Sequence, residues 1–185
     1  MRTAPLLSVV GLALAASACS EQQTTFTAPV FESALSVVGG DGKTEVVPLA
    51  GHYEIPERIT DAHGTAIFHL RDDGTGLDFA LRVENINNVV QAHIHVGPDD
   101  ANGPVVAFLF GPVAPGGGPI RGAIARGTVT ADDLIGPLAG LTIADLVAEI
   151  QAENAYVNVH TDDGVDPTNT GPGDFPGGEV RGQIR

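Results

Sequence analysis

Two histidines, His93 and His95, lie two residues apart in "QAHIHVG" (91–97), a run that otherwise has the composition of a β-strand. Residues i and i+2 of an extended chain project from the same face, so both imidazoles share one face. The same alternation in "AYVNVHT" (155–161) places His160 on the face that points away from the core. Imidazole nitrogens are ligands of copper and zinc. If the two strands are neighbours, these histidines predict a metal site with an open position for water or substrate.

The same histidines have a second interpretation that needs no metal. Their ring nitrogens could brace the loops that follow the two strands, 97–104 and 162–174. In the metal interpretation, Tyr156 and Asn158 share the face of His160 and would support its ligands. The other histidines, His52, His63 and His69, come earlier in the chain. The pattern places His69 on a solvated position, and His52, next to Tyr53, could reach a surface site.

Two acidic loops raise the question of calcium, which prefers carboxylate and carbonyl oxygens. One is "GPDDANG" (97–103) and the other is "TDDGVDPTNTGPGD" (161–174). Neither has the regular ligand spacing of an EF-hand, and Asp-Gly and Asn-Gly pairs are ordinary turn formers. The carboxylates concerned are Asp99 and Asp100 in the first loop and Asp162, Asp163, Asp166 and Asp174 in the second.

The elements that must position these side chains are short strands. In "AIFHLRDDGTGLDFALRVEN" (66–85), two alternating runs flank a turn and predict a β-hairpin with one buried face. Regular turns between many short strands predict an all-β fold, an immunoglobulin-like β-sandwich or barrel. Further strands are predicted at 91–97, 103–110, 119–130, 154–161 and 177–185.

A short helical insertion around 131–152 interrupts the strands. Thr130 with Asp133, and Thr142 with Asp145, have the spacing of capping boxes, in which the threonine and the acidic side chain exchange hydrogen bonds with each other's backbone. After Thr142, apolar residues recur at helical spacing and predict an amphipathic helix.

The first residues have the features of an export signal. A positive start is followed by an apolar stretch too short to span a membrane, which predicts a signal peptide over 1–18. Cys19 is the only cysteine and lies where a bacterial lipoprotein signal places the lipidated residue, although Ala16 replaces the more usual leucine. The alternative is a plain signal peptide. We expect a lipid anchor in the membrane, a tether over 19–32, one folded domain over 33–185, and a periplasmic or cell-surface location, at the outer membrane.

The composition is strongly acidic, with 9 Lys and Arg residues against 23 Asp and Glu residues and a formal net charge of -14. Such a charge disfavours nucleic acid and anionic membrane surfaces as partners. It is typical of a solvated exported protein, and it also favours cations.

Six motifs occur along the chain in the order "LAGHYEIP" (49–56), "GTAIFHL" (64–70), "AHIHVG…NGPVV" (92–106), "GTVTADDL" (127–134), "AYVNVHT" (155–161) and "GGEVRGQI" (177–184). Together they resemble the CHRD domain, a module named after the animal protein chordin. The resemblance covers about residues 33–185 and implies an exported all-β domain, often behind a lipoprotein signal, but no reaction. The region before Gly51 is longer and less regular than the family pattern.

The histidine motifs "AHIH" and "VNVH" also resemble those of copper/zinc superoxide dismutases, which are β-sandwiches too. This resemblance implies copper ligands at His93, His95 and His160. No histidine lies between His95 and His160, so the bridging histidine and the zinc subsite have no counterpart, and the disulfide is absent. We therefore expect no dismutase turnover and, more generally, no enzyme. The expected function is a binding module for an unknown protein or small ligand, with a copper-binding protein as the alternative.

Overall fold

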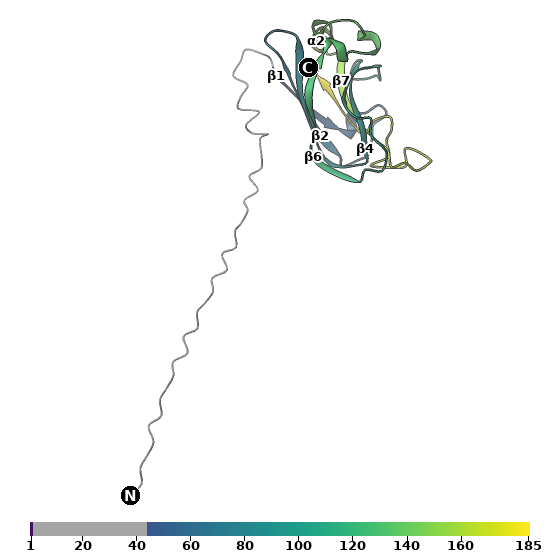
Figure 1. The fold of residues 1–185 in the computed structure, drawn as a ribbon. Helices are drawn as coiled ribbons and strands as arrows, with labels where there is room; N and C mark the ends of the chain where they lie inside the picture. Colours follow the sequence, from purple (N-terminus) through teal and green to yellow (C-terminus); the bar gives the residue numbers. More distant parts are fainter. Residues whose placement is uncertain (2–43) are drawn as a thin grey trace. The chain divides into compact units, whose positions relative to one another are not determined.

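The computed structural model describes Met1 and residues 44–185 (Figure 1). The predicted signal peptide, the lipidation site Cys19 and the tether lie outside the described residues. The strands are β1 (Thr44–Ala50), β2 (His63–Leu70), β3 (Gly76–Asn87), β4 (Val89–Val96), β5 (Val105–Phe110), β6 (Pro119–Thr130), β7 (Ala155–Thr161) and β8 (Val180–Ile184). The helical segments are η1 (Gly51–Tyr53), η2 (Ala131–Asp133), η3 (Gly136–Leu138) and α2 (Ile143–Gln151).

The strands form one eight-stranded antiparallel sheet in the order β5-β4-β7-β8-β1-β2-β3-β6. The two edge strands, β5 and β6, approach each other, so the sheet nearly closes into a barrel. This arrangement confirms the predicted all-β class. Apolar side chains from every strand fill the interior, among them Phe68, Leu81 and Ile94, each at most 2% exposed.

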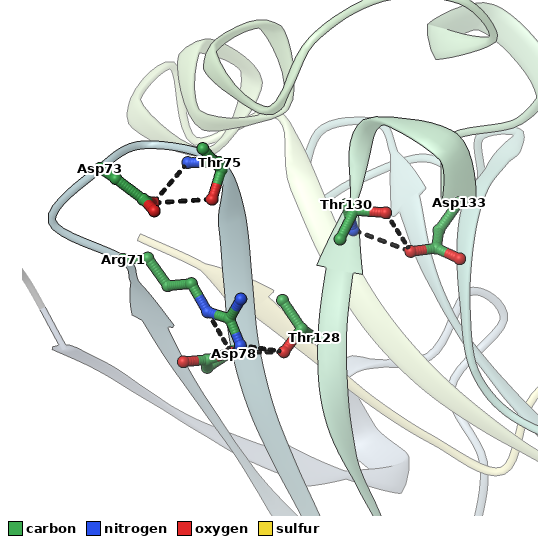
Figure 2. Close-up of polar contacts among 7 residues, drawn as sticks. All are labelled: Arg71, Asp73, Thr75, Asp78, Thr128, Thr130 and Asp133. Atoms are coloured by element: carbon green, nitrogen blue, oxygen red, sulfur yellow. Dashed lines mark hydrogen bonds and ion pairs between the residues drawn. The ribbon is translucent and has the colours of Figure 1, made fainter.

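The predicted hairpin is formed by β2 and β3. Its alternation is confirmed, because Ala66 and Phe68 are buried on β2 and Leu77, Leu81 and Val83 are buried on β3. Figure 2 shows the turn and its surroundings. The carboxylate of Asp73 accepts hydrogen bonds from the Thr75 backbone N–H and hydroxyl at 2.9 and 2.7 Å.

A polar cluster ties the hairpin to β6 on the outside of the sheet (Figure 2). Arg71 donates from Nε to Asp78 at 2.9 Å and from its terminal nitrogen to the hydroxyl of Thr128 at 2.8 Å. The side chains of this ion pair are exposed, so solvent screens it and it adds little to stability. The cluster therefore links the hairpin to β6 at the surface.

The helical insertion is confirmed between β6 and β7. Both capping boxes form, and the Asp133 and Asp145 carboxylates each accept from the backbone and hydroxyl of the threonine three residues earlier (Figure 2 shows the first). Leu146 of α2 is fully buried in the core. The amphipathic pattern therefore folds as a helix because one face has the barrel interior to pack against.

Strand β1 was not among the predicted strands, yet it closes the middle of the sheet. Its sequence "TEVVPLA" contains Pro48, which has no backbone N–H to donate. β1 pairs with β2 along seven residues but with β8 only at Ala50 and Arg181, so a proline in the strand is tolerated.

Among the residues described, no helix has the length and apolar character needed to cross a membrane.

Candidate metal centre

Strands β4 and β7 lie side by side, which is the condition that the metal interpretation required. Their antiparallel register places His93 opposite Asn158 and His95 opposite Tyr156, although these segments are more than 60 residues apart in sequence. One ring nitrogen from each of His93, His95 and His160 lies within 4.8 Å of the other two. The structure thus brings together the three histidines that the sequence singled out.

The face that carries these imidazoles is not exposed to solvent. His93, His95 and His160 are 3%, 7% and 6% exposed, and β7 is buried along its whole length. Loops that follow the strands cover the face, as the contacts of Gly103 and Pro176 with the histidine rings show. The sheet is therefore buried on both sides at this point, and the histidines cannot be ordinary solvated residues.

Backbone carbonyls orient two of the three rings. Nδ1 of His95 donates to the carbonyl of Gly103 at 2.8 Å, and Nδ1 of His160 donates to the carbonyl of Pro176 at 2.8 Å. A carbonyl oxygen can only accept, so in both neutral rings the proton is on Nδ1. The lone pair of each ring is consequently on Nε2, the atom that a metal would use.

The third ring, His93, has no contact with a loop carbonyl. Its Nδ1 lies 3.0 Å from Nε2 of His160, and because that Nε2 carries a lone pair, His93 donates the proton. Nε2 of His93 and Nε2 of His95 are both buried without any hydrogen-bond partner among the described residues. Leaving a buried polar atom unsatisfied costs about 1–3 kcal/mol, so this arrangement is costly unless another ligand is bound.

The electrostatics keep the rings neutral. Burial, with a smaller effect of the neighbouring histidines, lowers the pKa of His93 to about 3 and that of His160 to about 4, for His160 against the opposing effect of the Pro176 carbonyl. Burial also lowers the pKa of His95, against the opposing effect of the Gly103 carbonyl. Metal ligation requires the unprotonated imidazole, and these rings meet that requirement at neutral pH without competition from protons.

Aromatic and cationic side chains surround the cluster. The ring of Tyr156 stacks on His95 with centroids 4.7 Å apart, and the Arg181 guanidinium lies 3.5 Å from the Tyr156 centroid. Phe108 makes an edge contact with His93 at 4.4 Å. Tyr156 therefore lies between Arg181 and His95. The guanidinium of Arg181 donates hydrogen bonds to the carbonyls of Pro98 and Ala101 in the loop 97–104.

Two glycines permit the loops to lie this close to the strands. A Cβ on Gly103 would stand 1.8 Å from the carbonyl oxygen of Val96. Gly178 has a φ of +121°, and a Cβ there would collide with the carboxylate of Glu54 and the amide of Asn158. The backbone approaches that cover the histidines are therefore available only to glycine.

Sequence reasoning missed Glu54, which lies in the segment after β1 and is 4% exposed. Its Oε1 and the Oδ1 of Asn158 are buried without hydrogen-bond partners in the described part of the chain. Burial raises the pKa of Glu54 to about 7, against the opposing charges of Arg181 and Arg58. No local pattern marks this residue, because its burial is produced by the loop carrying Gly178.

The remaining histidines stay apart from the cluster. His63 is hydrogen-bonded to the backbone carbonyl of Asp61, His69 contacts the hydroxyl of Thr44, and His52 packs against the ring of Tyr53. Of the acidic residues, Asp162, Asp163 and Asp174 come together, whereas Asp99 and Asp100 are in no such group among residues 44–185.

The separations in the cluster come near those around a common metal ion, since one nitrogen from each ring lies within 4.8 Å of the others. Two nitrogens that bind one tetrahedral metal at 2.0–2.1 Å are about 3.3 Å apart, and the His93–His160 contact is 3.0 Å. Binding one ion through Nε2 of all three rings would break the hydrogen bond from His93 to Nε2 of His160 and bring the rings closer together. Three imidazoles would leave a fourth position open.

Comparison with protein families gives a match to the family model described as "CHRD domain" over residues 46–184, which spans seven of the strands completely and all three histidines. Neither the curated proteins nor the solved structures give a match.

Proposed function

Because the chain belongs to the CHRD domain family, we propose that it is a binding module of this family whose ligand is a copper ion held by His93, His95 and His160. The observation that supports this most directly is the convergence of the three rings, two of which have a buried Nε2 without a partner. A bound metal would satisfy these lone pairs and offset the cost of burying them.

Copper is favoured over other divalent metals by the donor set. Neutral imidazoles bind copper, zinc, iron and nickel, and the intrinsic affinity of such a site is highest for copper. The carbonyls of Gly103 and Pro176 fix the rings of His95 and His160, and such outer contacts increase the basicity of the ligating nitrogen. When bound, copper would supply a redox-active ion with an open coordination position. We assign the module to metal binding and handling, not to catalysis.

The test is a titration of metal-free protein with Cu²⁺, followed by electron spin resonance and calorimetry. We expect one equivalent to bind with a nitrogen-ligand signature. His93→Gln is the most informative variant. The His93 ring is hydrogen-bonded to His160 and not to a loop carbonyl, so its replacement should leave the loops in place. We expect this variant to lose the signal. His69→Gln, at a histidine outside the cluster, should bind as the wild type does.

Two results would overturn the copper proposal. One is a wild-type protein that gives no signal at one equivalent. The other is an equal signal from the wild type and the His93→Gln variant, which would place the ion elsewhere. Competition with Zn²⁺ measures the preference between the two metals, and we expect copper to displace zinc.

We also propose that the chain is exported and anchored at the outer membrane by a lipid on Cys19, with the domain on the periplasmic or outer side. The support is the signal-like start of the sequence and the single cysteine at its end. In cell fractionation, the wild type should remain with the membrane and Cys19→Ala should be released. Co-fractionation of the two proteins would refute the anchor.

A groove suggests a second candidate function, the binding of a small polar ligand. It has a volume of about 480 Å³, within the range of ligand sites, and its lining includes Tyr53, Glu54 and Arg181. Thermal-shift screening of small metabolites would test this role. Compounds that stabilise the wild type but not Tyr53→Ala support the groove, while equal stabilisation of both proteins would rule it out.

A further inference from the structure

A second group of potential ligands lies where the chain leaves β7. Asp162 and Asp163 directly follow this strand, and Asp174 ends the loop that begins there. One carboxylate oxygen from each of the three lies within 4.8 Å of the other two. Two oxygens on opposite sides of a calcium ion are about 4.6–5.2 Å apart, so this spacing matches a shared ion.

Asp174 is the member that an ordinary solvated turn does not explain. It is 2% exposed, and only its Oδ2 is hydrogen-bonded, to the backbone N–H and hydroxyl of Thr170 at 2.8 and 2.9 Å. Its Oδ1 is buried without a partner among the described residues. A buried carboxylate oxygen without a donor is costly, and a bound cation relieves that cost.

The other two carboxylates also have one oxygen available. Oδ1 of Asp162 accepts from the N–H of Gly164 at 2.7 Å, and Oδ1 of Asp163 accepts from the N–H of Val165 at 2.8 Å. Their second oxygens have no hydrogen bond within residues 44–185. Each aspartate therefore uses one oxygen to hold the loop and leaves the other for a ligand.

The local charge is negative. The ion pairs between described residues involve Asp78, Glu84, Asp99 and Glu153, but none of these three aspartates. The fully buried Glu179 adds a fourth carboxylate nearby, where it accepts from the N–H of Gly173, the residue before Asp174. Such a concentration of negative charge at low exposure attracts a multivalent cation.

We propose that Asp162, Asp163 and Asp174 bind a calcium ion. Oxygen ligands on a loop fit Ca²⁺, which accepts flexible geometry, better than Mg²⁺, which demands an octahedron of short bonds. The site is distinct from the three histidines in its donor atoms, and hard carboxylate oxygens do not compete with imidazoles for copper. The calcium proposal is therefore independent of the copper proposal.

Calorimetric titration of chelator-treated full-length protein with CaCl₂ tests the site. We expect one ion per chain with a Kd of about 10⁻⁴ to 10⁻³ M, the range of extracellular modules. Asp163→Asn and Asp162→Asn retain the size of the side chain, and each should weaken binding about tenfold by removing a ligand charge. Asp166→Asn, an exposed residue of the same loop outside the group, should leave the affinity unchanged.

Absence of a calcium-dependent heat up to about ten times that Kd range would overturn the proposal. Equal calcium affinities for the wild type, Asp162→Asn and Asp163→Asn would also overturn it. So would a loss of calcium affinity in Asp166→Asn as large as that in the other two variants, because the loss would then reflect the change in net charge and not the removal of a ligand. His93→Gln, tested in parallel, should bind calcium normally, so that a failure of either metal proposal is recognised separately.

Discussion

At the scale of single residues, His95 and His160 resolve what looked like two competing interpretations. Each ring uses Nδ1 to hold a loop carbonyl and directs Nε2 into the cluster. Loop bracing and metal ligation therefore involve different atoms of the same side chain. The brace also fixes the tautomer, so it leaves Nε2 available for the metal ion that we propose.

Gly103→Ala should destabilise the metal-free domain by about 2 kcal/mol or more. The new methyl group would stand 1.8 Å from the Val96 carbonyl oxygen, so the backbone must shift and displace the carbonyl that holds His95. Urea unfolding of the purified variant measures the loss of free energy.

Gly117→Ala is the matched control, because a Cβ there meets nothing within 4 Å and its backbone is not left-handed. We expect it to retain wild-type stability. If both variants unfold at the same urea concentration, the close approach of the Gly103 backbone to Val96 does not affect the free energy of unfolding.

At the scale of elements, the position of β7 between β4 and β8 creates the site. The pairing of β4 with β7 places His160 beside the histidine pair, and the pairing of β4 with β5 shifts register just before His93 and again just before His95. Such irregularities redirect side chains and often accompany functional sites. The connection from β6 to β7 runs through the helical insertion, whose helix α2 leads directly into β7.

Thr142→Ala should destabilise the domain by about 1 kcal/mol, because it removes the hydroxyl that caps α2 together with Asp145. Thermal unfolding checks this value. Thr142→Ser retains a hydroxyl and should restore most of the stability. Equal melting temperatures for Thr142→Ala and the wild type would show that Leu146 anchors the helix without help from the cap.

At the scale of the whole molecule, buried ionisable groups give stability two opposing dependences on pH. The pKa values of His93 and His160 are lowered from 6.5 to about 3 and about 4, so the unfolded chain binds more protons and stability is lost as pH falls from 6.5. Glu54 acts in the opposite direction. Its pKa is raised from 4.5 to about 7, so its contribution is present below pH 4.5 and is lost as pH rises to 7.

Glu54→Gln should separate these effects in the metal-free protein. The variant lacks the opposing group, so its stability should rise more steeply than that of the wild type between pH 4.5 and pH 7. Relative to the wild type it should gain up to about 3 kcal/mol across this interval. Urea unfolding at a series of pH values provides the comparison, and parallel profiles for the two proteins would refute the raised pKa of Glu54.

Local features of the fold could be predicted from the amino-acid sequence alone. Alternation identified the β2–β3 hairpin and the strands that follow, because a strand with one buried face has a period of two. The spacing of threonine and aspartate identified both caps, and the His-x-His pattern placed His93 and His95 on one face. Strand β1 was missed because Pro48 weakens its pattern and its burial depends on its partners.

The long-range features could not be predicted in this way, because they depend on the tertiary structure. The approach of His160 to His93 depends on which strands are neighbours, and no periodicity encodes sheet order. The burial of the histidine face, the burial of Glu54 and the grouping of Asp174 with Asp162 all depend on loops that fold back over the sheet. Sequence patterns report which face of an element a side chain occupies, whereas burial and lone-pair satisfaction depend on what covers that face.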